Sequence, residues 1–403
     1  MSVFQELVGQ AEAIEEIQRA SAAARSIVAA SDGSPAHSSA MSHAWLFTGP
    51  PGSGRSYAAR AFAAALLCSG DEPGCGECAG CRAVLANNHP DVDIVSTELV
   101  TISADEVRSY VSKSYLAPSS GKWRIFIIED ADRMISRTTN VLLKAIEEPA
   151  PRTVWMLCTA AVADVLPTIR SRCRNINLVT PDVEDVARLL VERDGVDPKD
   201  AMIAARASQA HIGVARALAT DPEAGLLRKN TLDALLSVRG VGDAVVAAQR
   251  LLDADAMHGR NANGAKKKGS KASTESDRDA EAREKMMDAL GLDSSGRIPA
   301  SVRSQLITDK DNAKRRQTRR ERDMLDRELI YMQSFFRDVL VVQLETGINL
   351  VNSDYEQQVY QRAQMLTPEQ AVEKIDALSL ARERLKGNVA ALLTMEAALI
   401  STR

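Results

Sequence analysis

The sequence lacks any run of about 18 apolar residues, the length that a membrane-spanning helix needs. Its N-terminal stretch also lacks the basic-then-apolar pattern of a secretory signal, because it carries Glu6, Glu12, Glu15 and Glu16 instead. An excess of one charge is missing as well, since the net charge at pH 7 is -4. We therefore expect a cytoplasmic protein without membrane contacts, in which any DNA contact comes from a local basic patch or from partners.

The chain is long enough to bury a sizeable core, with 403 residues of which 45% are hydrophobic and 26% charged. Length and composition predict two or three domains. Short apolar runs that alternate with helical patterns predict an α/β fold, a parallel sheet covered by helices, over residues 1–180. The strands are expected over 44–48, 124–128 and 153–158.

The rest of the chain has a helical pattern with one interruption. Apolar residues three to four positions apart predict a helical lid domain over 181–256 and a helical collar domain over 324–403. The stretch 257–323 is polar and low in aromatic residues, with basic clusters at 266–268 and 314–316. This composition is typical of a low-complexity insertion or linker. We interpret it as a solvated linker, with DNA binding as the alternative.

A phosphate-binding loop is predicted between the first strand and the helix that follows. Gly49-Pro-Pro-Gly52-Ser-Gly54-Arg55-Ser56 has the spacing of a P-loop in every position except one, because Arg55 stands where lysine is expected. The glycines let backbone N–H groups turn toward phosphate oxygens, and the helix N-terminus adds a favourable dipole. Ser56 would lie at the magnesium ion. The alternative is a chance turn rich in glycine and proline.

Two departures predict that this pocket hydrolyses ATP weakly or not at all. The guanidinium of Arg55 is a planar fork, wider than the compact ammonium of lysine. The second strand ends in Glu129 then Asp130, whereas phosphoryl-transfer ATPases of this class carry Asp then Glu. A displacement of about 1 Å from productive geometry costs on the order of a hundredfold in rate. ATP or ADP with Mg²⁺ could still bind, and tolerated variants in a working ATPase are the alternative.

Four of the six cysteines predict a structural Zn²⁺ site. Cys68-x6-Cys75-x2-Cys78-x2-Cys81 supplies four thiolates that can converge on one tetrahedral ion. A four-thiolate shell is closed and leaves no position for a catalytic water. Disulfides or free thiols are the alternative.

A possible arginine finger follows the third strand, in Ile169-Arg170-Ser-Arg172-Cys173. An arginine there could reach the nucleotide of a neighbouring subunit and stabilise the charge that develops on the transferred phosphoryl group. On spacing alone, two solvated arginines beside a buried cysteine are the better interpretation. Cys158 and Cys173 are expected to be core residues.

Together these segments resemble the clamp-loader branch of the AAA+ ATPases. The resemblance rests on Asn140-x-Leu142-Leu143-Lys144-x-x-Glu147-Glu148-Pro149, on the Ser171-Arg172-Cys173 box, and on the cysteine module directly after the phosphate-loop helix. It covers residues 3 to about 218 well and the C-terminal bundle in outline. It implies a RecA-like parallel sheet domain with a zinc module, a helical lid and a C-terminal helical collar.

The resemblance also implies roles for single residues. Leu7-Val-Gly-Gln10 is similar to the segment that lies near the adenine, and Thr159 to the residue that senses the phosphate. Arg172 matches the finger that acts in trans, which reverses the interpretation from spacing alone. Arg216, in Gly213-Val-Ala-Arg216, matches the second sensor arginine of the lid.

Among clamp-loader subunits the chain resembles the delta-prime type, which often has a degraded nucleotide site beside an intact Ser-Arg-Cys box. The motor type, gamma/tau, carries lysine in the phosphate loop and the Asp-Glu order. The resemblance implies a stator of the DNA polymerase III holoenzyme. Its partners would be the gamma/tau and delta subunits in a five-subunit ring, the sliding clamp, and primed DNA through the complex.

Two rival functions stay open. The chain could be the gamma/tau-type motor ATPase itself, although Arg55 argues against it. It could also be an autonomous DNA-binding adapter that uses the lysine-rich stretch within 257–323, although the overall negative charge argues against that.

Overall fold

The computed structural model describes residues 2–30, 39–96, 101–120, 122–160, 162–262, 300–387 and 389–403. The chain divides into two compact units. The first comprises Met1–Leu227 and Asp338–Thr367, and the second comprises Arg228–Arg337 and Pro368–Arg403. The four-domain division predicted from the sequence, with boundaries near 180, 256 and 323, stays a proposal.

A five-stranded parallel sheet forms the centre of the first unit, in the order β2-β3-β4-β1-β5. Its strands are β1 (Ala44–Thr48), β2 (Val92–Val95), β3 (Arg124–Ile128), β4 (Thr153–Thr159) and β5 (Arg174–Asn177). The three strands predicted from apolar runs are confirmed, and they are the three inner strands. The edge strands β2 and β5 were not predicted, because each has polar residues that interrupt the apolar run.

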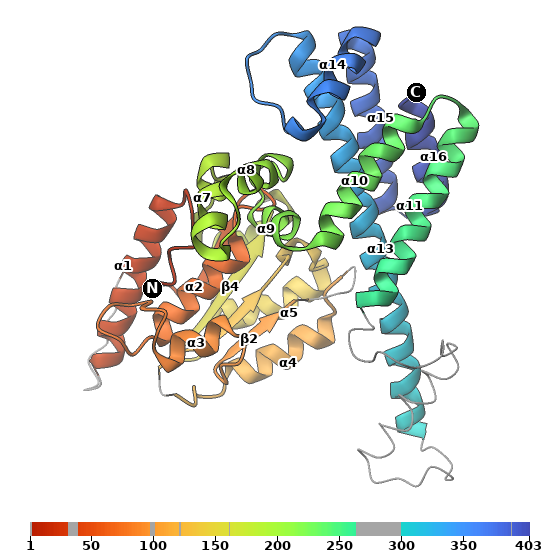
Figure 1. Ribbon diagram of the computed structural model, residues 1–403. Helices are drawn as coiled ribbons and strands as arrows, with labels where there is room; N and C mark the ends of the chain where they lie inside the picture. The colour runs from red at the N-terminus through yellow and green to blue at the C-terminus, as the bar shows by residue number, and fades with distance from the viewer. Residues whose placement is uncertain are drawn as a thin grey trace, which may run out of the picture. The chain divides into compact units, whose positions relative to one another are not determined.

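Helices cover both faces of this sheet (Figure 1). Trp45 and Phe47 of β1 point to one face, where they join the buried residues of the first two helices. Leu46, between them, points to the opposite face. The helices on the first face are α1 (Ala11–Ala29), α2 (Arg55–Leu67) and α3 (Ala79–Leu85), and those on the second are α4 (Ala104–Ser114), α5 (Ser136–Glu147) and α6 (Pro167–Arg170).

Helix α2 lies close to the sheet because its inner face is almost all alanine. Phe62, Leu66 and Leu67 are the exceptions, and the Phe62 ring packs edge-on against Trp45 with 5.0 Å between the ring centroids. Such a pair contributes about 0.5–1.5 kcal/mol beyond the area that it buries. The position of α2 matters because its N-terminus forms the end of the phosphate loop.

Three helices, α7 (Val183–Asp194), α8 (Pro198–Ala207) and α9 (Ile212–Thr220), follow the sheet, as predicted. They share a small buried core that is rich in alanine. Gly195 ends α7 in the left-handed conformation with φ +67°, and Asp197 caps α8 by accepting the Lys199 N–H at 2.9 Å. We call α7, α8 and α9 the lid; they lie within the lid domain predicted over 181–256, of which the part from Arg228 belongs to the second unit. The first unit also contains α14 (Glu356–Met365).

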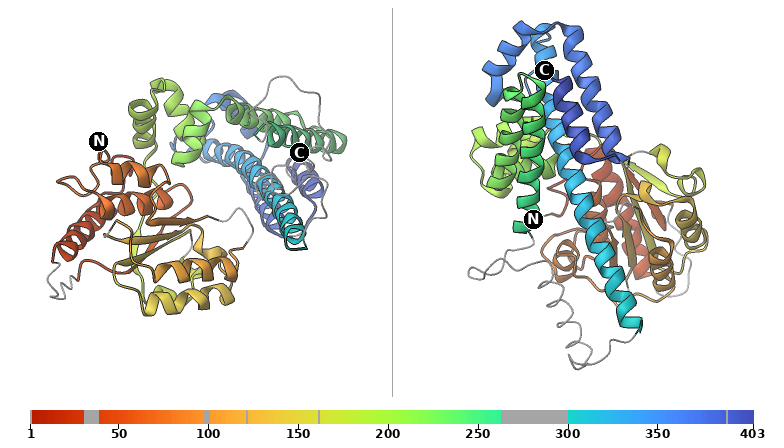
Figure 2. Two further views of the ribbon diagram at one scale, coloured as in Figure 1. Left: turned by 90° about the horizontal axis from the view of Figure 1, so that it is seen from below. Right: turned by 90° about the vertical axis from the view of Figure 1, so that its right-hand side faces the viewer.

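The second unit is helical. Its helices are α10 (Pro222–Ser237), α11 (Val241–Ala262), α13 (Ala300–Gln343), α15 (Pro368–Lys386) and α16 (Ala391–Ser401), of which α10 and α13 extend into the first unit. Helix α16 packs on α11 and α15 (Figure 2). Arg382 holds α15 on α13 through two bonds to Asp326, at 2.7 and 3.1 Å.

Helix α13 begins at Ala300, inside the stretch 257–323 to which the sequence analysis gives no fold. Its turns over 308–323 are rich in Lys, Arg and Asp and have no apolar stripe, so the periodicity reveals only the part from about Leu325. The basic cluster at 266–268 lies outside the described residues. Over the part of the chain that is described, no helix combines the length and the apolar character that crossing a membrane requires.

Candidate functional site

The phosphate loop connects β1 to α2, as the sequence predicts. Gly54 is the N-cap of α2 and, like Gly52, has a φ of +88°, which disfavours any side chain. A Cβ on Gly49 would lie 2.4 Å from the Leu178 carbonyl oxygen, so the loop also needs glycine where it passes the end of β5. Three positions of the loop therefore require glycine, while nucleotide binding by the loop stays a prediction.

Arg55 does not extend away from this loop. Its guanidinium donates a hydrogen bond to the Gly49 carbonyl, at the opposite end of the same loop. The side chain that replaces the expected lysine therefore closes the loop on itself, and at least one of its donors is used within the protein.

The carboxyl ends of β3 and β4 bring three predicted site residues to the same edge of the sheet. Glu129 and Asp130 follow β3, and Asp130 has a φ of +51° and lies 3.3 Å from the Arg133 guanidinium. Thr159, the last residue of β4, lies 3.3 Å from an Asp132 oxygen, to which its hydroxyl can donate. Because β4 lies between β3 and β1, these residues share one edge with the phosphate loop.

Cys158, just before Thr159, is fully buried and is a core residue, as predicted. Burial raises the pKa of its thiol, and the nearby charge of Glu129 raises that pKa further. The thiol therefore stays neutral and does not act as a nucleophile at physiological pH.

The lid contacts the phosphate loop through a residue that the sequence analysis missed. His211 is the N-cap of α9, and its Nδ1 accepts the Val214 N–H at 3.3 Å. A Cβ on Gly52 would lie 2.5 Å from the His211 Cγ and 2.8 Å from its Cα. His211 and Gly52 are 159 positions apart, and a single histidine before a helix gives no signal of such a contact.

Arg216, the predicted second sensor, lies on the same helix as His211. Its Nε is 3.1 Å from an Asp194 oxygen at the end of α7, and its side chain is 57% exposed. In this structure the residue therefore ties two lid helices together, and a role toward nucleotide stays a proposal.

Arg172 lies just beyond α6 and is held by two elements. Its Nη2 is 2.8 Å from the Glu147 carboxylate at the end of α5, and its Nη1 donates to the Thr168 carbonyl at 2.9 Å. The structure thus brings together Glu147 and Arg172, which belong to two motifs of the clamp-loader resemblance. Cys173 packs against the core on that side, and burial raises its pKa to about 12.

The four predicted metal ligands converge. The sulfur atoms of Cys68, Cys75, Cys78 and Cys81 all lie within 4.8 Å of one another. The Cys68 sulfur is 3.6 Å from that of Cys75 and 3.9 Å from that of Cys78. Tetrahedral Zn²⁺ with bonds of about 2.3 Å separates its sulfur ligands by about 3.8 Å. The spacing therefore fits the ion, and none of these cysteines forms a disulfide.

Backbone N–H groups around the cluster donate hydrogen bonds to the sulfur atoms, which favours their ionised, thiolate form. Gly70 donates to the Cys68 sulfur at 3.3 Å, and Cys81 donates to that of Cys78 at 3.4 Å. Although burial opposes ionisation, these N–H groups lower the pKa of Cys68 and bring that of Cys78 to about 5. Burial raises the pKa of Cys81, and the Cys78 and Cys68 thiols add to that rise. A bound cation would let all four ionise.

Two family models match the chain. One, described as DNA polymerase III, delta subunit, matches residues 33–182, and the other, described as DNA polymerase III, delta subunit, C terminal, matches residues 281–402. The first match contains the phosphate loop, the cysteine module and Arg172.

Curated relatives of the chain include delta' and gamma/tau subunits of DNA polymerase III. The delta' subunit of DNA polymerase III from Escherichia coli K12 is 33% identical over 181 residues, 44% of this chain and 54% of that protein. The delta' subunit from Pseudomonas aeruginosa is 36% identical over 135 residues, 32% of this chain and 41% of that protein. The gamma/tau subunit from Mycobacterium bovis is 30% identical over 168 residues, 40% of this chain and 29% of that protein. The chain thus spans between about a third and about half of the length of these relatives.

A solved structure of a DNA polymerase III gamma subunit-related protein from Thermotoga maritima aligns over 91% of this chain and 99% of its own. Its TM-score is 0.34 and its identity 16%, so it adds no argument about the fold. The two family matches together span about two thirds of the chain, and they agree with the delta' relatives. The chain therefore belongs to the DNA polymerase III delta-subunit family, a clamp-loader family of the AAA+ class.

Proposed function

We propose that this chain is a delta-prime-type stator of the DNA polymerase III clamp loader. It hydrolyses ATP slowly or not at all, and its Arg172 completes the ATP site of a neighbouring gamma/tau-type subunit. One contrast within the first unit carries the proposal. The chain's own side chains contact its phosphate loop at Gly49 and Gly52, whereas the Arg172 side chain is 41% exposed.

The state of the phosphate loop argues against rapid ATP turnover. The outer phosphates of a nucleotide bind against the N–H groups of such a loop and against its lysine. Here Arg55 donates to the Gly49 carbonyl, and His211 lies against Gly52. To admit the phosphates, the guanidinium must leave the carbonyl and the lid must move off the loop. Both rearrangements cost binding free energy.

The state of Arg172 is suited to action in trans. Glu147, Thr168 and Ser171 accept bonds from its guanidinium, which has five N–H groups, so further donors remain for a phosphate. An ion pair between two half-exposed side chains is worth about 0–1 kcal/mol. The pair therefore orients the guanidinium at the surface and opens readily when a more highly charged triphosphate is near.

The partners in this proposal are the gamma/tau and delta subunits, the sliding clamp, and primed DNA through the complex. ATP binding in a neighbouring motor subunit would draw the ring into the clamp-opening state. Hydrolysis, aided by Arg172, would then release the clamp on DNA. A finger of this kind raises hydrolysis by about 10³-fold or more at the site that it completes.

The test is Arg172→Ala in the loader reconstituted with its own gamma/tau and delta subunits. One ATP site of the loader is completed by this chain. We expect Arg172→Ala to remove the whole contribution of that site to the steady-state ATPase rate. Arg170→Ala is the matched control, because Arg170 is exposed on the same turn and should leave the rate unchanged. An ATPase rate that is the same for Arg172→Ala and wild type would refute the finger role.

A motor function is the second candidate, because a gamma/tau subunit is also 30% identical to this chain over 168 residues. It predicts that the isolated chain hydrolyses ATP at a rate close to that of the complete loader. The stator proposal predicts no ATP hydrolysis above background in the isolated chain. It also predicts that Arg55→Lys restores little ATPase activity while the Glu129-Asp130 order is unchanged.

We further propose that the four cysteines hold one structural Zn²⁺. The sulfur spacing and the N–H donors around the cluster support this ion. When bound, it would fix the turn between α2 and α3 and leave no open position for water.

A further inference from the structure

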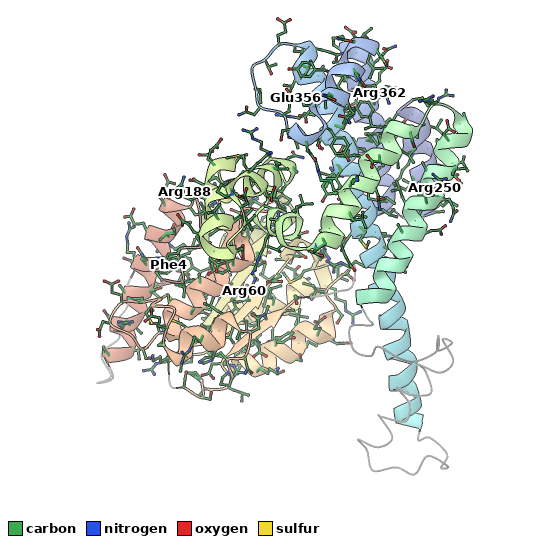
Figure 3. The ribbon with its side chains drawn as sticks, viewed as in Figure 1. Phe4, Arg60, Arg188, Arg250, Glu356 and Arg362 are labelled. Carbon is green, nitrogen blue, oxygen red and sulfur yellow. The ribbon has the colours of Figure 1, made fainter. Side chains whose placement is uncertain are left out.

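The N-terminal segment from Val3 to Gln10, here called the strap, contacts several parts of the first unit that are distant in sequence. Figure 3 labels Phe4 in the strap. Val3, Phe4 and Leu7 are between 2% and 5% exposed, so the segment is anchored although it contains no long element of secondary structure. Its contacts reach the cysteine module, the phosphate-loop helix and the lid.

The first end of the strap lies on the cysteine module. The Val3 N–H donates to the Gly74 carbonyl at 2.9 Å, and Gly74 directly precedes Cys75. Gly74 has a φ of +84°, and a Cβ there would lie 2.8 Å from both the Phe4 ring and a Val3 methyl. The backbone of the metal loop is therefore the surface on which the strap packs.

The middle of the strap lies on the phosphate-loop helix. The Tyr57 hydroxyl donates to the Val3 carbonyl at 3.0 Å, and a Leu7 methyl lies 3.8 Å from where a Gly54 Cβ would be. Burial, with the charge of Glu6, raises the pKa of Tyr57 to about 12, so this hydroxyl remains a donor throughout the physiological range. Val3 thus joins the metal loop to α2 through both of its backbone polar groups.

The last part of the strap holds the lid and the segment that leads to it. Gln10 bonds the backbone of Val179 twice, donating to its carbonyl at 2.7 Å and accepting its N–H at 3.0 Å. Glu6 lies 2.9 Å from the Arg193 guanidinium on α7. Arg193 in turn binds Asp194, with which Arg216 is paired. The strap therefore reaches the predicted second sensor through one chain of ion pairs.

We propose that the strap couples the metal module to the lid, so that metal bound by the four cysteines fixes the position of α7 and α9 over the phosphate loop. The proposal rests on the metal site proposed above and on no property of Arg172. The physical basis is that Gly74 is part of the metal loop, and that the Val3 N–H bonds to Gly74 while the Val3 carbonyl accepts from Tyr57. If the loop loses its shape, the strap loses its anchor, and local opening spreads to the lid.

The test is hydrogen–deuterium exchange of the full chain, loaded with Zn²⁺ or stripped with a chelator. We expect stripping to speed exchange at least tenfold in residues 3–10, and by a smaller factor in residues 183–220. Residues 104–114 of α4, on the other face of the sheet, should not change. If Zn²⁺ binds and exchange in the strap is the same with and without it, the coupling is refuted. Equal acceleration in α4 would also refute it, because the metal would then stabilise the unit as a whole.

A variant isolates the strap from the metal. Glu6→Gln with Gln10→Ala removes the ion pair with Arg193 and the bonds to Val179 and leaves the Gly74 contact, so Zn²⁺ stoichiometry should stay at one while lid exchange responds much less to metal. Gln5→Ala is the matched control, since Gln5 is an exposed residue of the strap and should behave as wild type. A chain that binds no Zn²⁺ would refute the metal site and the coupling together. A variant lid that still responds fully to metal would refute only the coupling.

Discussion

At the scale of single residues, the contact between lid and phosphate loop can be tested with two glycines that share one backbone conformation. Gly52 and Gly54 both have a φ of +88°, so alanine costs about 1–3 kcal/mol in backbone strain at either position. Only at position 52 would the new Cβ also collide with His211. At position 54 the nearest atom is 3.8 Å away, an ordinary contact.

We therefore expect Gly52→Ala to lower the free energy of unfolding by about 1 kcal/mol or more beyond the loss in Gly54→Ala. Urea unfolding followed by circular dichroism measures both values. His211→Gly in the Gly52→Ala background should restore part of the difference, because it removes the ring that the methyl meets. Equal losses in the two alanine variants would mean that the lid does not rest on the loop.

At the scale of elements, a buried carboxylate fixes the turn that follows α13. Asp338 is fully buried and accepts the N–H groups of Val351 and Asn352 at 3.0 and 2.7 Å. It also accepts the Asn352 side-chain amide at 2.9 Å. Asp338→Ala leaves these donors buried without that acceptor, so we expect a loss of about 3–5 kcal/mol in stability. Asp354→Ala, at an exposed position nearby, is the comparison in the same thermal-unfolding assay. Similar melting temperatures for the two variants would contradict the assigned role.

Strands and motifs were predictable where a short continuous stretch of sequence carries their whole pattern. The inner strands β1, β3 and β4 are continuous apolar runs, and the phosphate loop and cysteine spacing are short motifs, so the sequence alone identifies them. The edge strands β2 and β5 are half polar, because one side of each has no neighbouring strand, and their pattern does not differ from that of a loop. The turns of α13 over 308–323 have no apolar stripe at all.

Contacts between distant segments were not predictable. Neither His211 nor Glu6 belongs to a motif, and each acquires its meaning only when the lid folds back on the sheet domain. The pairing of Arg172 with Glu147 is intermediate: both lie in motifs that the sequence analysis quotes, but no pattern indicates that they meet. The sequence thus identifies the motif residues that are expected to bear the chemistry, and it misses those that connect one part of the unit to another.

At the scale of the whole molecule, the chain divides into two compact units, and the cysteine module lies in the core of the first. Removing a structural metal should therefore act on one unit. The helices α2 and α3 remain packed on the sheet without the ion. The loss in the free energy of unfolding should therefore be well below the 10–16 kcal/mol or so with which a zinc-finger peptide binds its ion. If the loss in the free energy of unfolding is about 2–4 kcal/mol, the melting temperature of the first unit falls by roughly 4–16 °C. Calorimetry of the full chain with and without chelator should show one transition that moves and one that does not.

Cys81→Ser, which removes one ligand, should reproduce the shift and abolish the response to chelator, whereas Cys173→Ser, a cysteine outside the cluster, should keep that response. If both transitions move together, the metal stabilises more than the first unit, and the assignment of a local structural ion is wrong.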